Sequence, residues 1–141
     1  MTRFVVDTSV AIAWYLPELF ADAAHKWRSR LREQSTTFCV PSLHYWEFAN
    51  VLRKNVRREV INRRDAGTIW SAHLEARLHV VDPARDKVLA TAFDYDASAY
   101  DSVYIALALE LDAPLLTAER SSTPWVMKLG ARAISIAAPP S

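Results

Sequence analysis

The 141-residue sequence predicts one α/β domain, a three-layer α/β/α sandwich around a mostly parallel central sheet. Short runs rich in β-branched and aromatic residues alternate with longer segments whose apolar residues recur at helical spacing. The composition, 51% hydrophobic and 23% charged, is ordinary for a globular domain, and the length suits a single core. We therefore expect one domain over residues 1–141, with 137–141 as a frayed tail.

The first half of the chain predicts two strands and three helices. Residues 4–6, Phe-Val-Val, form a short apolar strand, and Ser9 then precedes an apolar run as the N-cap of a first helix. Residues 18–34 carry apolar side chains at helical spacing and predict a second helix. Residues 36–40 predict a second strand, and Ser42 is expected to cap the third helix.

The second half continues the alternation and predicts, in chain order, a helix, a strand, two helices, a strand, a helix and a strand. Their expected ranges are 62–78, 79–82, 84–95, 100–112, 113–117, 123–129 and 131–136. Gly130 follows the last helix, where glycine often ends a helix. Because strands that alternate with helices pair in parallel, the sheet is expected to carry helices on both faces.

The composition excludes several kinds of site. The only glycines are Gly67 and Gly130, so neither a P-loop nor a glycine-rich dinucleotide loop can be built. Cys39 is the single cysteine, which excludes an internal disulfide and a cysteine-based zinc site. No apolar stretch approaches the ~18 residues of a membrane span, and the N-terminus lacks a signal-peptide pattern. We expect a soluble cytoplasmic protein that does not bind membranes.

Four acidic residues stand where they would meet at one edge of the sheet. Asp7 and Glu119 follow strands, Asp101 opens a helix, and Glu47 lies one turn into another helix. The carboxyl ends of parallel strands share an edge, so these carboxylates are expected to converge. Their mutual repulsion favours a hard cation such as Mg²⁺, which takes oxygen ligands. Such an ion can activate water and neutralise charge on a phosphodiester.

Hydroxyl and basic groups accompany these acids. The hydroxyls of Thr8, Ser9 and Thr117 are expected to hydrogen-bond the metal ligands or the phosphates of a substrate. The basic tract after the helix of Glu47 is either a solvated helix face or a surface that binds an RNA backbone. Its first members, the expected RNA-binding residues, are Arg53, Lys54, Arg57 and Arg58.

The four histidines show no spacing typical of metal ligands, so they are interpreted as structural or exposed. They are His25, His44, His73 and His79.

Four stretches, FVVDTSV, SLHYWEFANVL, AYDSVYIALALEL and PLLTAER, resemble in order and spacing the PIN-domain ribonucleases, and within these the VapC-type toxins of bacterial toxin–antitoxin pairs. The resemblance covers nearly the whole chain. It implies an endoribonuclease that depends on Mg²⁺ or Mn²⁺, with Asp7, Glu47 and Asp101 as catalytic, metal-binding acids. The family's usual aspartate is replaced here by Glu119, which we expect to contact the ion through a water.

The resemblance also implies partners: an RNA substrate, a cognate antitoxin and a second copy of the chain in a homodimer. The apolar first helix and the aromatic-rich second helix are the candidates for an antitoxin groove. Two alternatives remain open. An aspartyl phosphotransferase would use Asp7 as nucleophile, but Ser9 stands where enzymes of the haloacid-dehalogenase kind have a second aspartate. A degenerate PIN fold would bind protein or RNA without cleaving it.

Overall fold

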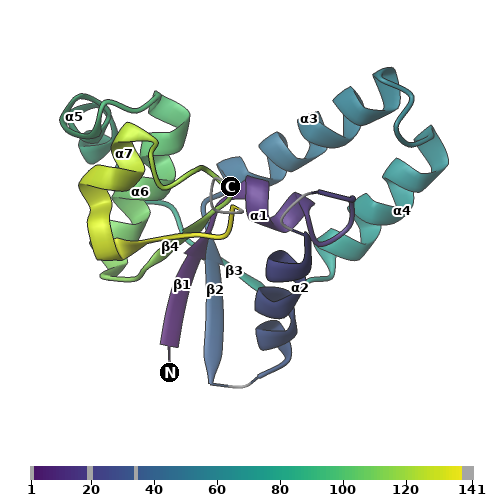
Figure 1. Cartoon of the computed structure of the whole chain (residues 1–141), viewed down its shortest axis with the longest axis horizontal. Coiled ribbons are helices and arrows are strands. Elements are labelled where there is room, and N and C mark those ends of the chain that lie inside the picture. The colour runs from purple at the N-terminus through teal and green to yellow at the C-terminus, as the bar shows by residue number, and fades with distance from the viewer. Residues whose placement is uncertain (1, 19–20, 34, 138–141) are drawn as a thin grey trace.

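A computed structural model describes residues 2–18, 21–33 and 35–137. Its sheet has five strands in the order β3-β2-β1-β4-β5, and every neighbouring pair among the described residues is parallel. The strands are β1 Thr2–Val6, β2 Thr36–Val40, β3 Leu78–Val80, β4 Leu115–Thr117 and β5 Ala133–Ser135. The first strand in sequence therefore lies at the centre, which confirms the expected α/β architecture (Figure 1).

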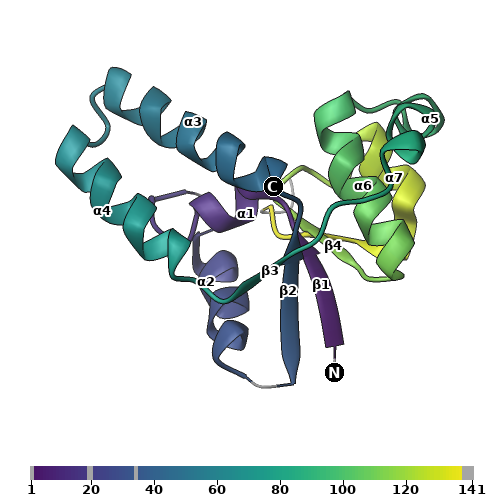
Figure 2. The ribbon, with the colours of Figure 1, turned by 180° about the vertical axis from the view of Figure 1, so that it is seen from behind.

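Helices cover the sheet on both sides (Figures 1 and 2). One side carries α1 Thr8–Ile12, α2 Ala21–Ser29, α3 Leu43–Arg57 and α4 Arg63–Leu74; the other carries α5 Arg85–Tyr95, α6 Ala99–Leu111 and α7 Pro124–Leu129. Short 3-10 turns, η1 Arg30–Arg32 and η2 Gly130–Arg132, precede β2 and β5. Helices α3 and α4 form a hairpin that projects beyond the sheet (Figure 1). Within the described residues, no helix combines the length and apolar character that crossing a membrane requires.

The prediction that Ser9 caps the first helix is wrong. Asp7 is the N-cap residue, since its N–H donates to the Leu116 carbonyl while its own carbonyl accepts from Val10 N–H at 3.0 Å. Pairing with β4 thus holds Asp7 extended, and the helix begins immediately after it. Ser9 instead accepts a hydrogen bond from Ala118 N–H at 3.1 Å.

Other boundaries differ because the strands are shorter or begin elsewhere than expected. The helix expected over 62–78 ends at Leu74, since the chain must turn before β3 begins at Leu78. The strands expected from 113 and 131 begin at Leu115 and Ala133, where pairing between β4 and β5 starts. The frayed tail expected at 137–141 lies, apart from Ala137, outside the described residues.

Two apolar cores lie on opposite faces of the sheet, because successive side chains of a strand point to opposite faces. Phe4 and Val6 of β1 pack in the core beneath α1–α4, whereas Val5 packs in the core beneath α6 and α7. Helix α1 lies within the first of these cores, and its Val10 and Ala11 are fully buried. This burial explains why the apolar first helix forms although it is only five residues long.

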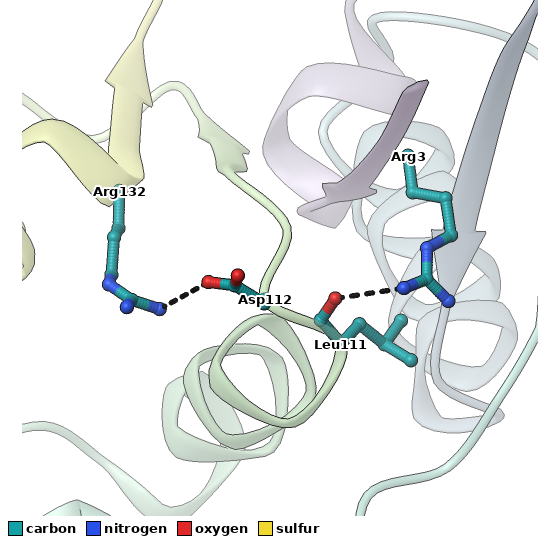
Figure 3. A network of polar contacts seen from close by, with 4 residues as sticks. All are labelled: Arg3, Leu111, Asp112 and Arg132. Carbon is teal, nitrogen blue, oxygen red and sulfur yellow. Dashed lines mark hydrogen bonds and ion pairs between the residues drawn. The ribbon is translucent and has the colours of Figure 1, made fainter. Parts of the chain in front are cut away.

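The edge of the sheet where the parallel strands begin is held by polar contacts at the end of α6 (Figure 3). Arg3 donates to the Leu111 carbonyl at 3.0 Å, and Arg132 pairs with Asp112 at 3.1 Å. Asp112 ends α6 with φ of 49°, in the left-handed region. Because the side chains of Arg132 and Asp112 are mostly exposed, at 52% and 85%, their ion pair contributes little to stability.

Candidate active site

The opposite edge of the sheet, where the parallel strands end, carries Asp7 directly after β1. Thr117, the last residue of the neighbouring β4, donates from Oγ1 to Asp7 Oδ2 at 3.0 Å. Thr117 Oγ1 also accepts from Glu119 N–H at 3.1 Å, and Ser9 accepts from Ala118 N–H. These hydrogen bonds join the loop after β4 to the start of α1. The Thr117 hydroxyl lies beside the Asp7 carboxylate, whereas the Ser9 hydroxyl contacts the backbone of that loop.

Glu47 enters the same region from the first turns of α3. Its Oε1 accepts from Tyr104 OH at 2.6 Å and lies 3.2 Å from Thr8 Oγ1. Three helices thus meet at one carboxylate oxygen, since Thr8 opens α1 and Tyr104 lies in α6. Asp101 lies one turn before Tyr104, and its N–H donates to the N-cap Ser98 at 3.0 Å.

The three acids influence one another electrostatically. The pKa of Asp7 is raised to about 7: burial is the main cause, the hydrogen bond from Thr117 opposes the shift, and the charges of Asp101 and Glu47 add to it. Burial also raises the pKa of Glu47 and that of Asp101. Among the described residues none of these three carboxylates forms an ion pair with Lys or Arg. Their negative charge is thus left without a protein cation.

Comparison with known proteins identifies the family of this chain. The family model described as the PIN domain matches residues 4–121, a span that includes all four predicted acids. The chain belongs to the PIN-domain family.

Three known proteins illustrate the similarity. Ribonuclease VapC3 from Pyrobaculum aerophilum is 29% identical over 122 residues, which cover 84% of this chain and 90% of that protein. The crystal structure of PAE2754 from the same organism superposes with a TM-score of 0.73 at 23% identity, over 96% of this chain and 84% of that one. VapBC2 from Rickettsia felis, bound to a DNA fragment from its promoter, gives a TM-score of 0.64 at 12% identity, over 95% and 97%. These two structures confirm the fold.

The residues of this PIN domain fit a hard divalent cation by their chemistry. Asp7, Glu47 and Asp101 offer only oxygen atoms, and their charge is not neutralised by a protein cation in the described part of the chain. In that part, no three His, Cys, Asp or Glu side chains converge closely enough to form a metal-holding cluster. Mg²⁺ does not need such a cluster, because it binds through one or two carboxylates and keeps several waters.

Glu119 lies in the loop after β4 with an exposed side chain. Its backbone is fixed at both ends, by the N–H bond to Thr117 and by a carbonyl that accepts from Ser135 Oγ at 2.5 Å. No hydrogen bond joins its carboxylate to the other acids among the described residues. The water-mediated role expected for Glu119 stays a prediction.

The expected RNA-binding side chains Arg53, Lys54, Arg57 and Arg58 are all exposed, along the second half of α3 and at its C-cap. At a rise of 1.5 Å per residue they lie roughly 9–16 Å from Glu47 along the helix axis. The projecting α3–α4 hairpin thus carries positive charge away from the acids.

The histidines are structural or exposed, as expected, but sequence reasoning missed Tyr104 and the contact between two of the histidines. His44 and His73 are fully buried and hydrogen-bonded to each other, whereas His25 and His79 are exposed. A signal for His44 was present, since it precedes Glu47 by one turn and shares its helix face. For His73, on another helix, the sequence offers none.

Proposed function

We propose that this PIN domain is an endoribonuclease that hydrolyses RNA phosphodiester bonds with the help of Mg²⁺ or Mn²⁺. The observation that carries this proposal is the group of three carboxylates at the carboxyl edge of the sheet, which have raised pKa values and form no ion pair with the described Lys and Arg side chains. The similarity to Ribonuclease VapC3 supports RNA as the substrate. Acidic residues whose pKa values are raised tend to cluster at functional sites.

In this proposal Asp7, Glu47 and Asp101 bind the cation, one or two of them directly and the rest through the waters that it keeps. When bound, the ion supplies activated water and offsets charge at the phosphate. Thr117 keeps Asp7 oriented through one carboxylate oxygen, and Tyr104 keeps Glu47 oriented in the same way. Fixed ligands reduce the reorganisation that binding requires, because their rotamers are already selected.

The basic residues of α3 are proposed to bind the RNA backbone. Arg53, Lys54, Arg57 and Arg58 are exposed and follow Glu47 on the same helix. Phosphate contacts of this kind position a strand without reading its sequence. The RNA would therefore run along the α3–α4 hairpin towards the acids.

An antitoxin is the proposed protein partner, in line with the similarity to VapBC2. The first helix, one of the two expected groove elements, lies in the core and offers no exposed face. A hollow of about 800 Å³ beside Trp14, Arg28 of α2 and Ala72 of α4 is a better candidate. A homodimer through α5, where Leu89 and Phe93 are exposed at 65% and 77%, is also proposed.

The decisive experiment measures cleavage of single-stranded RNA by the purified chain, with Mg²⁺, with Mn²⁺ and with EDTA. Asp7→Asn and Asp101→Asn should each lower the rate by more than about 100-fold, because losing a metal ligand costs more than losing a supporting residue. Asp112→Asn is the matched control, since that acid lies at the far edge of the sheet and Asn also tolerates its left-handed backbone.

Wild-type rates in both Asp7→Asn and Asp101→Asn would contradict the metal site. A wild-type chain that binds RNA without cleaving it in any metal would instead support the non-catalytic alternative. Mg²⁺ should also raise the melting temperature of the wild type, and this rise should shrink in both variants, because a ligand that binds only the folded state stabilises it.

A further inference from the structure

A chain of hydrogen bonds begins at Glu47 and enters the core beneath α1–α4. Tyr104 OH lies 2.6 Å from Glu47 Oε1 and 2.7 Å from Thr8 Oγ1. Thr8 Oγ1 lies 3.0 Å from His44 Nδ1. Thr8 and Tyr104 are almost fully buried and His44 completely so, which makes each of these contacts shielded from water.

The chain continues through a second histidine. His44 Nε2 lies 2.8 Å from His73 Nε2, and His73 Nδ1 lies 3.0 Å from the Tyr15 hydroxyl. We call the series Tyr15, His73, His44, Thr8 and Tyr104 the histidine chain. It joins side chains from α6, α3, α4, α1 and the turn that follows α1.

Counting protons fixes the direction of the first half of the histidine chain. The contacts Glu47–Tyr104, Tyr104–Thr8 and Thr8–His44 each need one proton. A carboxylate has none to give, and the two hydroxyls supply two. The third proton must come from His44, so His44 Nδ1–H donates to Thr8, Thr8 to Tyr104, and Tyr104 to Glu47. The longer contact of 3.2 Å between Thr8 Oγ1 and Glu47 Oε1 then has no proton of its own.

The second half then follows from the neutral state of both imidazoles. Neutral His44 with its proton on Nδ1 has a bare Nε2, which must accept from His73 Nε2–H. His73 is then bare at Nδ1 and accepts from Tyr15 OH. All five hydrogen bonds are thereby satisfied with one proton each, and every donor points towards Glu47.

The surroundings favour neutral imidazoles. His73 stacks on Phe48, with centroids 3.9 Å apart and planes at 11°. Burial and the neighbouring His73 lower the pKa of His44 to about 3; burial and the Arg28 charge lower that of His73 to about 4. The Arg28 guanidinium lies 4.8 Å from the centre of the Tyr15 ring, at the far end of the chain.

We propose that His44 and His73 are positioning residues for Glu47, because their paired, directed protons leave Thr8 to donate to Tyr104 and Tyr104 to donate to Glu47 Oε1. This inference rests on the proposed function only for what Glu47 does once it is positioned. Oε1 accepts from Tyr104 OH and lies 3.2 Å from Thr8 Oγ1, while no hydrogen bond to Oε2 is found in the described part of the chain. The histidine chain thereby selects which carboxylate oxygen is presented to a cation.

The first test reads the tautomers directly and needs no activity. Long-range proton–nitrogen spectra of the nitrogen-15-labelled full chain, at neutral pH with Mg²⁺, should show His44 protonated at Nδ1 and His73 at Nε2. The exposed His25 and His79 serve as references in the same spectrum. The opposite tautomers, or a charged imidazole at either position, would overturn the proposal.

The second test uses two substitutions of similar size at His44. His44→Asn keeps an amide donor near the Nδ1 position and so can still donate to Thr8, whereas His44→Gln places its amide near Nε2 and loses that donor. Each variant loses one of the two hydrogen bonds that the His44 imidazole forms, so the melting temperatures of both should fall by similar amounts. His44→Gln should cleave RNA about 10–100-fold more slowly than the wild type, and His44→Asn should recover most of that loss.

The rise in melting temperature with Mg²⁺ is the readout that does not depend on cleavage. It should stay near the wild-type value in His44→Asn and shrink in His44→Gln. Equal rises in the two variants would overturn the positioning role, even if the protein proves to be a nuclease. If the wild type cleaves no RNA, the tautomers and the Mg²⁺ response still decide this proposal, while the proposed function fails separately.

Discussion

The two faces of the sheet satisfy their buried polar side chains in different ways. Beneath α5–α7, Thr91 donates to the Lys87 carbonyl and Ser102 to the Ser98 carbonyl, each one turn back on its own helix. Beneath α1–α4, the partners are distant in sequence: His44 and His73 are 29 residues apart. Beneath α5–α7, buried polar side chains form hydrogen bonds within their own helix. Beneath α1–α4, they form hydrogen bonds between helices.

This difference shows where the loss of one hydrogen-bond partner would destabilise the fold most. A buried polar group that loses its partner costs about 1–3 kcal/mol, so a chain of such groups is tolerated only where every member is satisfied. The histidine chain meets this condition and ends at Glu47. Beneath α5–α7, the buried hydroxyls of Thr91 and Ser102 depend only on their own helices, so this core supports the site by packing.

The largest expected effect comes from two substitutions on α6, one at a hydroxyl of the histidine chain and one at an apolar side chain that only packs. Tyr104→Phe removes only the hydroxyl at Glu47 and should slow cleavage about 10–100-fold with a modest change in stability. Leu107→Ala, at a fully buried position on the same helix, should lower the free energy of unfolding by about 2–5 kcal/mol while the cleavage rate per folded molecule stays near the wild type. Urea denaturation and cleavage assays at a permissive temperature measure both. The reverse pattern would abolish the distinction between the hydrogen-bonded histidine chain and the apolar packing.

A second effect should appear in the pH dependence of stability without metal. The pKa of Asp7 is raised from 3.8 to about 7, so between these values the folded state binds a proton that the unfolded state does not. Stability should therefore fall as pH rises from about 4 to 7, by a few kcal/mol at most. Above that window Mg²⁺ should stabilise the protein more strongly than at pH 5.5.

The control for this pH effect is the same scan of melting temperature, in EDTA, on Asp7→Asn and Leu107→Ala. In Asp7→Asn the melting temperature should decrease less with rising pH than in the wild type. In Leu107→Ala the melting temperature should be lower at every pH but should change with pH as in the wild type. An unchanged slope in Asp7→Asn would show that Asp7 does not titrate in this window.

A third, smaller effect concerns charge on the α3–α4 face. In an Asp7→Asn background, which prevents cleavage, Arg57→Ala combined with Arg58→Ala should weaken RNA binding several-fold and reduce the salt slope by about 1.4. The matched control removes exposed Arg85 and Lys87 from α5, on the other face. Fluorescence anisotropy at several salt concentrations tests both pairs. Equal losses from the two pairs would mean that RNA binds by overall charge.

The smallest effect is expected at Glu119, which lies between the two faces in the loop after β4. If Glu119 contacts the ion through water, Glu119→Gln should slow cleavage only a few-fold and weaken the Mg²⁺ response slightly, while Glu119→Asp should be close to neutral. If Glu119→Gln lowers the cleavage rate as much as Asp7→Asn does, Glu119 is a direct ligand of the ion. No change at all would leave a site of three acids.

The acids that end or open an element could be predicted because their positions follow from local signals. Asp7 ends an apolar strand and Asp101 begins a long apolar helix, and parallel topology then brings both to one edge. Glu47 was a looser prediction, since nothing nearby in sequence showed why an acid stands among aromatic residues. The reason is Tyr104, a hydroxyl from 57 residues away.

The sequence by itself determined the order of strands and helices, the alternation that splits each strand between two cores, and the acidic character of one edge. These depend on side-chain period and on strand ends, which are short-range properties of the chain. Tertiary structure decided that Asp7 rather than Ser9 caps α1, because the Asp7 N–H pairs with β4. It also decided that two histidines meet 2.8 Å apart beneath Glu47, because the packing of α3 against α4 has no counterpart in local spacing.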